Sequence, residues 1–587
     1  MTGDLYVAAQ SPSGAIYAFD GARWRLVFDG TNLVPGGLVA FRADTTVTTS
    51  SEVLLSATLP SPLAPGVYTA LAFVAQAGGD PLNEPAWRSN LAQIAFGFAD
   101  ATSGGSPFLT AADVSAVVRR AAEAVDATTM VIAVTDRGGN VLGVFRTASA
   151  PQQVVGNFGQ PVRADELAVS LARTGAFFSN DQAPLSSRTV RYLSGIHFPP
   201  GIRNKPNAPL YGIENTNRGC SLNTVFNPGQ AVVPARALNG RPCDGFDASG
   251  CGLGIATGKA DVFDSDPSAV NGGGVPIFKD GVVVGGIGVT GIAPAAAELA
   301  AFAGSVPDGG ARFGPRPAEP GAIFLDGLQL PFVSQTTPTS GPGVFDGSFT
   351  LGPLDSPFGA AGVPDGWLVG PLAGADLTAS EVETIVIQSI DVASRARAAI
   401  RLPLGSRTRM VIAVTDLRGA ILGLFRMPDA TVFSIDVAVA KARNMVFFSG
   451  PNRLPQDLPG VPPATAVSNR TISFGAQPLY PPGIDGTEPG PFFQLYLDDV
   501  SAPCRQGSQP QHVNQSGIVF FPGSLPLYKN GRLVGGLGIS GDGVEQDDLV
   551  AAGGATGFPP PEAIRADQIV LGGARLPFLK FPRNPFE

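Results

Sequence analysis

The sequence predicts a multi-domain α+β protein, with an N-terminal β-sandwich followed by two copies of an α/β domain. Three observations support this fold class: the composition, a long internal repeat, and a first segment of about 100 residues that matches neither copy. The length of 587 residues also favours three or four domains, at roughly 150 residues per domain.

The composition is typical of a loop-rich globular protein with large buried cores. Its 75 glycines and 54 prolines make up 22% of the 587 residues, whereas 15% of the residues are charged and 44% are hydrophobic. This balance argues against intrinsic disorder. The glycines have no collagen period, and no long polar helical face suggests a coiled coil.

Charge and hydropathy exclude two classes of partner. The 39 basic and 48 acidic residues give a net charge of −9 and form no basic stripe, so nucleic acid is not expected as a partner. No uninterrupted apolar run reaches about 18 residues, so no membrane span is expected. The first residues lack the pattern of a secretion signal, but the low charge and the even number of cysteines favour an extracellular or periplasmic location.

A repeat organises most of the chain. Thr129–Gly139 closely matches Arg409–Gly419, and shorter matches follow in the same order, which indicates a tandem duplication with divergent loops. These matches include Phe177-Phe178-Ser179 with Phe447-Phe448-Ser449, Pro276–Gly281 with Pro526–Gly531, and Leu330-Pro331-Phe332 with Leu576-Pro577-Phe578.

Each copy is expected to contain the same series of elements. A first helix begins after the N-cap Thr110 or Thr378, each of which is followed three residues later by an acid. A β-hairpin, a second helix, a long Pro/Gly-rich insertion and a second hairpin with an Asp-Gly or Asn-Gly turn follow. The expected ranges are 111–125, 164–177 and 275–290 in copy one, and 380–399, 434–447 and 525–540 in copy two.

The domain boundaries follow from this pattern. Short alternating strands at 15–19, 24–28, 53–59, 67–74 and 92–98 predict a β-sandwich over residues 1–100. Copy one spans 108–335 with an insertion at 180–272, and copy two spans 375–587 with an insertion at 450–525. The Gly/Pro/Ser-rich segment 336–374 between them is interpreted as a linker.

The repeated unit resembles the GlcG/HbpS haem-binding domain family, which includes the PduO C-terminal domain. The resemblance rests on the strand that ends in Asp136 or Asp416, the glycine hairpin after it, and the closing pattern Gly538–Gly553. Copy one lacks the acidic cluster of that closing pattern. The resemblance implies an antiparallel sheet packed by helices, dimeric assembly, haem binding and no catalytic role, so the two copies would form a pseudo-two-fold pair.

The histidines and acids are the candidate ligand residues. His197 and His512 are the only histidines, and both are candidate haem-binding residues, although neither is shared between the copies. Asp542, Glu545 and Asp547 form a candidate metal site, or else complement the start of a helix. Asp264 and Asp266 offer oxygen ligands for calcium, outside any EF-hand pattern.

Four cysteines allow three disulfide connectivities, and none of them forms a CxxC motif. Because Cys220 and Cys504 follow equivalent segments of the two copies, the pseudo-dimer implied by the resemblance would place them face to face, leaving Cys243–Cys251 as a local pair. Pairing of Cys220 with Cys243 or with Cys251 remains an alternative.

Two hypotheses for the function follow. The first is a secreted, non-enzymatic protein that binds haem or another tetrapyrrole. The second is a structural or assembly protein of an extracellular complex, which associates with protein partners or with itself through its Pro/Gly-rich and aromatic loops. No nucleophile–base pair or metal-ligand spacing suggests an enzyme.

Overall fold

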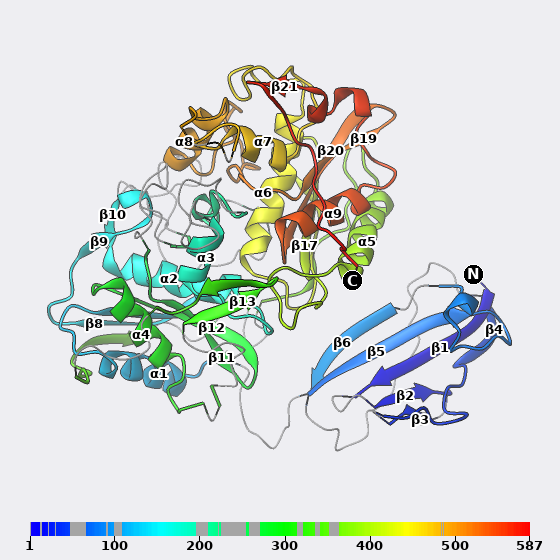
Figure 1. Ribbon diagram of the computed structural model, residues 1–587, viewed down its shortest axis with the longest axis horizontal. Helices are drawn as coiled ribbons and strands as arrows, with labels where there is room; N and C mark the ends of the chain where they lie inside the picture. The colour runs from blue at the N-terminus through cyan, green and yellow to red at the C-terminus, as the bar shows by residue number, and fades with distance from the viewer. Residues whose placement is uncertain are drawn as a thin grey trace. The chain divides into compact units, whose positions relative to one another are not determined.

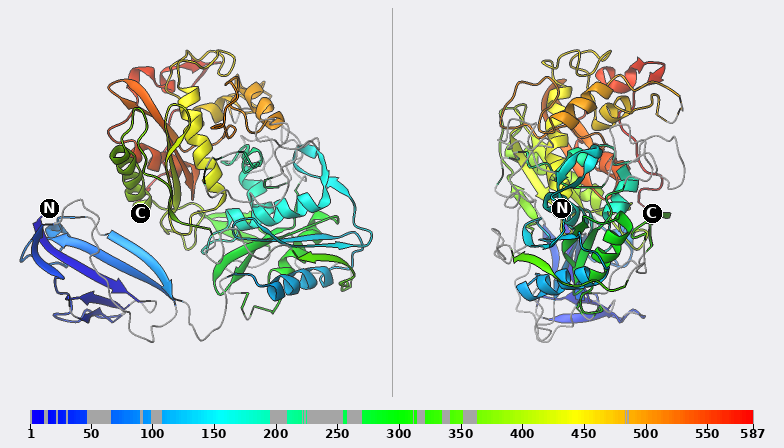
Figure 2. Two further views of the ribbon diagram at one scale, coloured as in Figure 1. Left: turned by 180° about the vertical axis from the view of Figure 1, so that it is seen from behind. Right: turned by 90° about the vertical axis from the view of Figure 1, so that its left-hand side faces the viewer.

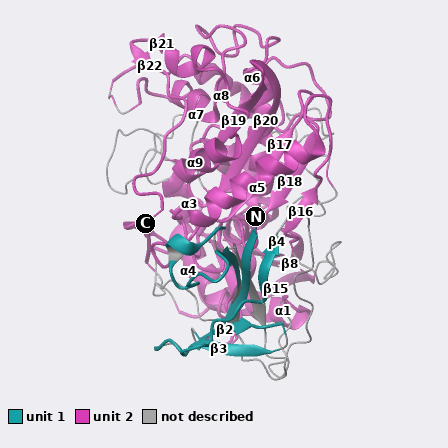
Figure 3. Cartoon of the chain, turned by 90° about the vertical axis from the view of Figure 1, so that its right-hand side faces the viewer, with its two compact units in different colours: residues 1–106 teal, residues 107–587 magenta. Residues whose placement is uncertain are grey.

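The computed structural model describes residues 2–11, 15–21, 23–29, 31–46, 66–89, 92–98, 108–194, 209–220, 222, 224, 254–257, 270–310, 312–313, 321–334, 341–351, 363–482, 484 and 486–586. The chain divides into two compact units, Met1–Ser106 and Pro107–Glu587 (Figure 3). None of the helices in the described part of the chain is both long and apolar enough to cross a bilayer.

The first unit is built on one antiparallel sheet. Its central strand β1 (Thr2–Gln10) pairs with β5 (Gly66–Ala75) on one side, and with β2 (Ile16–Phe19) and β4 (Arg42–Thr46) on the other. The sheet ends at β3 (Trp24–Phe28) and at β6 (Ala92–Phe98).

Four of the strands expected in this unit are present, and β1 and β4 were not expected. A sandwich needs two packed sheets, whereas the described residues form one sheet, so the β-sandwich stays a prediction. The strand expected at 53–59 lies outside the described residues.

Two five-stranded antiparallel sheets form the second unit, and their strand orders correspond (Figure 1). The first sheet has the order β11-β12-β7-β8-β15 and the second has the order β19-β20-β17-β18-β16. We call the described parts of residues 108–351 the first half and those of residues 363–586 the second half. The strands are β7 (Val131–Asp136), β8 (Val141–Thr147), β11 (Gly274–Lys279), β12 (Val282–Thr290), β15 (Gly347–Leu351), β16 (Gly366–Val369), β17 (Met410–Thr415), β18 (Ile421–Arg426), β19 (Ser524–Lys529) and β20 (Arg532–Gly541).

Helices pack on both faces of each sheet. In the first half, α1 (Ala111–Glu123) and α4 (Pro294–Gly304) lie together on one face, and α2 (Ala164–Phe178) covers the other. In the second half, α5 (Ala379–Arg395) and α9 (Val544–Gly554) lie opposite α6 (Phe433–Phe448). The expected caps are confirmed, because Thr110 and Thr378 each form a capping box with the acid three residues later.

Shorter elements complete the two halves. Helices α3 (Ser187–Ser194) and α7 (Asn469–Gly475) occupy corresponding places after α2 and α6, whereas α8 (Phe493–Ser501) belongs to the second insertion. Three small hairpins are β9–β10 (Gln153–Val155 and Pro161–Arg163), β13–β14 (Ala322–Leu325 and Leu328–Pro331) and β21–β22 (Val570–Leu571 and Ala574–Arg575).

The glycines of β12 and β20 allow a helix to lie directly on the strand. A Cβ atom at Gly288 would lie 1.9 Å from the carbonyl oxygen of Ala168 in α2. A Cβ atom at Gly538 would lie 2.0 Å from the carbonyl oxygen of Ala438 in α6. Any side chain at these positions would therefore push the helix off the sheet.

The interpretation of residues 336–374 as a linker was wrong in one respect. This segment contains β15 and β16, which pair with β8 and β18 and so add an edge strand to each sheet. A strand at a sheet edge pairs with a neighbour on one side only. A Gly/Pro-rich segment can therefore form such a strand.

The two halves share one hydrophobic core. Every residue of α6 is buried, because this helix lies between its own sheet and the first half (Figure 2). Phe178 at the end of α2 stacks on Phe433 at the start of α6 with ring centroids 4.2 Å apart. The backbone N–H of Val432 donates to the carbonyl oxygen of Phe177 at 3.0 Å. Because α6 has no solvent-exposed face, it does not need the separate polar face that a surface helix shows.

Candidate functional site

A cavity of about 550 Å³ lies where the two halves meet. The first half contributes residues around the end of α3 and the β13–β14 hairpin, and the second half contributes the end of β20, the first turn of α9 and the C-terminal segment. The described lining residues are Leu193, Pro209, Leu210, Leu325, Asp326, Leu328, Leu330, Arg397, Ala399, Ile400, Phe433, Phe521, Ser540, Gly541, Gly543, Val544, Glu545, Gln546, Asp547, Lys580, Phe581, Pro582 and Arg583.

The walls of this cavity are apolar and come from both halves. Leu325 and Leu330 are buried on the hairpin side, at 2% and 1% exposed, and Phe433 and Phe521 are each 1% exposed on the other side. All four side chains belong to the hydrophobic core that the two halves share. The volume falls in the range of cavities that bury most of a drug-sized ligand.

The start of helix α9 opens into the cavity. Gly543 occupies the N-cap position with φ 146°, and no side-chain oxygen accepts a hydrogen bond from the first turn. The residues of that turn, Val544 to Gln546, line the cavity. Unpaired N–H groups at a helix start carry partial positive charge and attract anions.

Charged side chains surround the mouth of the cavity. Arg397 forms an ion pair with Asp326 across the two halves, and Lys580 forms an ion pair with Glu545. Arg583 is exposed and has no ion-pair partner among the described residues. Three cations against two acids leave the mouth with an excess of positive charge.

A buried ion pair lies beneath the cavity. Lys441 Nζ is 2.9 Å from Asp547 Oδ2 and also donates to the carbonyl oxygen of Ile539 at 2.7 Å. Burial raises the pKa of Asp547 to about 7, against the opposing effect of Lys441. Asp547 is 2% exposed, and its second oxygen, Oδ1, has no hydrogen-bond partner. The cavity therefore has an acceptor on its lining that a bound molecule could satisfy.

The described contacts of Asp542, Glu545 and Asp547 do not support the metal site predicted there. Each carboxylate has its own cation: Asp542 pairs with Arg401, Glu545 with Lys580, and Asp547 with Lys441. Within the described residues, no group of three or more His, Cys, Asp or Glu side chains could hold a metal ion. The N-cap position of α9 is occupied by Gly543. Calcium is therefore not supported at this place.

Of the two predicted histidine ligands, His512 is not among the described residues that line the cavity. His512 is partly buried, which lowers its pKa, and its Nδ1 accepts a hydrogen bond from the backbone N–H of Asn514 at 3.2 Å. This contact is typical of a loop histidine. His197 lies outside the described residues, as do Asp264, Asp266, Cys243 and Cys251.

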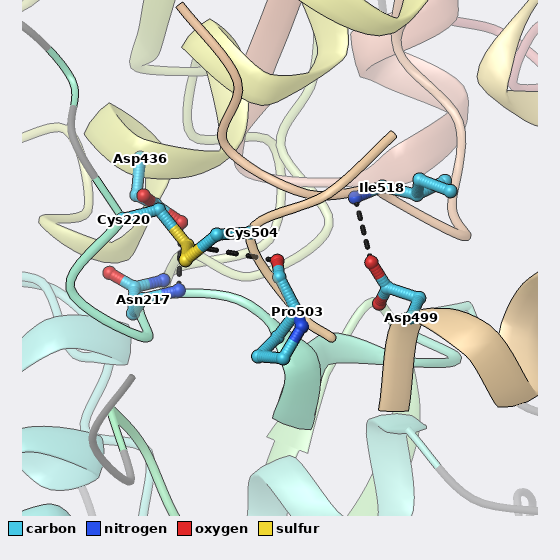
Figure 4. Close-up of a disulfide and its surroundings, with 7 residues drawn as sticks. All are labelled: Asn217, Cys220, Asp436, Asp499, Pro503, Cys504 and Ile518. Atoms are coloured by element: carbon cyan, nitrogen blue, oxygen red, sulfur yellow. Dashed lines mark hydrogen bonds between the residues drawn. A yellow bond between two sulfur atoms is a disulfide. The ribbon is translucent and has the colours of Figure 1, made fainter. Parts of the chain in front are cut away.

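Cys220 and Cys504 form a disulfide that joins the two halves (Figure 4). This pairing is the one that the resemblance implied. Next to it, the backbone N–H of Asn217 donates to Asp436 Oδ2 of α6 at 2.7 Å, and burial raises the pKa of Asp436 to about 6. The disulfide therefore holds the loop of the first half to the segment after α8, and the Asn217 hydrogen bond holds the same loop to α6.

A charged cluster between the halves was missed by the sequence analysis. Arg401 Nη1 donates to Asp429 Oδ2 at 2.6 Å and to Gln182 Oε1 of the first half at 3.1 Å. Burial and the nearby Asp429 carboxylate raise the pKa of Asp181 to about 6. Asp542 was the one member that the sequence singled out. Its partners lie far away in the sequence, and no local pattern marks them.

Comparisons with known proteins match part of the chain. Residues 388–556 match the family described as "Haem degrading protein HbpS-like". The chain is 26% identical over 171 residues to "Corrinoid adenosyltransferase PduO" of Salmonella typhimurium. It is 51% identical over 41 residues to "Uncharacterized 15.0 kDa protein in dhaT-dhaS intergenic region" of Citrobacter freundii. These matches cover 29% and 7% of this chain, and 38% and 29% of the relatives' lengths.

Three solved structures are similar to part of the chain. Klebsiella pneumoniae protein ORFY is 21% identical, over 30% of this chain and 88% of that chain, with a TM-score of 0.20. The PduOC:heme complex is 21% identical, over 30% and 92%, with a TM-score of 0.20. A double mutant of Streptomyces reticuli HbpS is 18% identical, over 31% and 88%, with a TM-score of 0.19. The sequence match at 388–556 includes Phe433, Phe521 and the first turn of α9, so an HbpS-like segment forms much of the second half's side of the cavity.

Proposed function

We propose that this protein binds haem or a related tetrapyrrole in the cavity between its two halves. The HbpS-like match supports the class of ligand, because the matched family is described by its action on haem. The cavity supports the location of the binding site, because the matched segment supplies one of the cavity walls. Bound haem would supply a redox-active iron and a strong visible absorption band.

The residues of the cavity fit a planar macrocycle with acidic side groups. Its apolar walls would cover the two faces of the ring, which makes burial of the ring favourable. The start of α9 and Arg583 would hold the carboxylates. The single observation that carries the proposal is therefore an apolar cavity of suitable size with a positively charged mouth, formed in part by the HbpS-like segment.

We also propose that the two halves are tandem copies of an HbpS-like domain. Equivalent side chains make the same contacts in both. Arg173 Nε donates to the carbonyl oxygen of Gly139 at 3.0 Å, and Arg443 Nε donates to that of Gly419 at 3.0 Å. The Arg188–Glu298 ion pair likewise has a counterpart in Arg470–Asp548.

The ligand proposal is tested by titrating the purified chain with haemin. A Soret band that saturates with added haemin is expected. Leu328→Glu places a carboxylate at the cavity mouth on a side chain that is 41% exposed, and should weaken binding about tenfold. Val570→Glu, at a residue that is 67% exposed and is not among the lining residues, is the matched control. No Soret band with the purified chain, and none after titration, would refute the proposal.

We further propose that the protein acts outside the cytoplasm as a binding protein without a catalytic role. The Cys220–Cys504 disulfide supports an oxidising compartment. A structural role remains the second candidate, favoured by the shared core and the disulfide, which make the two halves one rigid body for assembly. If haemin does not bind, this role requires stable higher-order particles, which light scattering on the purified chain would detect.

A further inference from the structure

We infer that the cavity recognises the macrocycle and its carboxylates rather than the iron, so that a metal-free porphyrin binds as tightly as haemin. This inference rests on the proposed function and names what the site selects.

The described lining residues offer no common haem ligand. They include no histidine, cysteine, methionine or tyrosine, the side chains that usually ligate haem iron. The chain has two histidines, and His512 contacts its own loop through Asn514. Among the described residues, the contacts available to a ligand are therefore apolar walls and charged groups.

The apolar walls supply the first of these contacts. Leu325 and Leu330 belong to one half, and Phe433 and Phe521 belong to the other. All four are almost fully buried, so their positions are set before a ligand enters. A rigid, planar, apolar ring gains most from walls that are already in place. This gain does not depend on a metal in the ring.

The charges at the mouth supply the second contact. The first-turn N–H groups of α9 lack a side-chain cap, and Arg583 has no ion-pair partner among the described residues. Arg397 and Lys580 are already paired with Asp326 and Glu545. The α9 start and Arg583 are thus the groups available for the carboxylates, which haemin and protoporphyrin IX share.

The experiment compares three ligands on the full chain by absorbance and fluorescence titration. Haemin and metal-free protoporphyrin IX should have dissociation constants within about threefold of each other. Protoporphyrin IX dimethyl ester, which lacks the negative charges, should bind at least about tenfold more weakly. Arg583→Ala should weaken binding of the two acids about fivefold and leave the ester unchanged. Arg532→Ala, at an exposed arginine that is not among the lining residues, is the matched control.

Substitution of the two histidines gives a second test in the same titration. The double variant His197→Ala/His512→Ala should bind haemin as tightly as the wild type. The inference is overturned, and the proposed function kept, if haemin binds and the metal-free porphyrin binds more than tenfold more weakly. It is likewise overturned if the double variant loses haemin but still binds the metal-free porphyrin. Failure of all three ligands to bind would overturn the proposed function itself.

Discussion

The Lys441–Asp547 ion pair gives the sharpest test of how the second half is stabilised. Lys441 is 0% exposed and Asp547 is 2% exposed. The first half has Leu171 and Ala297 at the corresponding places of α2 and α4. One half therefore contains a buried ion pair where the other has two buried apolar side chains.

The ion pair of the second half predicts different losses in the free energy of unfolding for a single and for a double substitution. Lys441→Leu leaves the Asp547 carboxylate buried without its cation, which should lower the free energy of unfolding by about 3–5 kcal/mol. The double variant Lys441→Leu/Asp547→Ala copies the first half and should lie within about 1 kcal/mol of the wild type. The difference between these values measures the coupling between the two residues.

Urea unfolding in a variant with one tryptophan measures this coupling locally. The chain has three tryptophans, and Trp24→Phe/Trp87→Phe leaves Trp367, which lies in β16 against Phe425 of the second sheet. Unfolding of the second half can then be followed separately from that of the first unit. The reasoning fails if Lys441→Leu costs less than about 1 kcal/mol, or if the double variant is as unstable as the single one.

Three further predictions concern pH, the disulfide and the glycines. Burial raises the pKa of Asp436 to about 6, so its stabilising contribution is complete below about pH 4 and is lost as the pH rises through about 6. Asp436→Asn should therefore be more stabilising relative to the wild type at pH 7.5 than at pH 5 by urea midpoint, and the opposite order would contradict this. Cys220→Ser/Cys504→Ser should lower stability by about 2–5 kcal/mol, because the bond closes a loop of 284 residues; peptide mapping that joins Cys220 to Cys243 would refute the connectivity. Gly538→Ala should lower the thermal midpoint by several degrees because of its contact with α6, whereas Gly341→Ala, with no atom near the added Cβ, should not; equal midpoints would refute the close-packing argument.

Local patterns explain which elements could be predicted from the sequence. The capping boxes at Thr110 and Thr378 and the Asp280-Gly281 and Asn530-Gly531 turns depend on neighbouring residues, and the helices and hairpins lie close to the expected places. The edge strands β15 and β16 were missed because they are short and lie in a Gly/Pro-rich segment. Their pairing depends on β8 and β18, which the segment's own sequence does not reveal.

The candidate site could be predicted only in part, for a different reason. The acids Asp542 and Asp547 stood out in the sequence, but their cations Arg401 and Lys441 lie more than about 100 residues away along the chain. An acidic cluster without its cations looks like a metal site. The cavity was also missed, because its walls come from two halves that meet only in the folded chain.

The two halves share a sheet order but differ where the cavity lies. In the second half, β20 continues through Gly541 and Gly543 into α9, whose first turn faces the cavity. In the first half, the corresponding helix α4 begins at Pro294, which has no N–H to offer an anion. A ligand held by a helix start would therefore find its site in the second half, with the β13–β14 hairpin of the first half as the opposite wall. The proposed site thus needs both halves and occurs once per chain, so a titration should saturate at one ligand per protein.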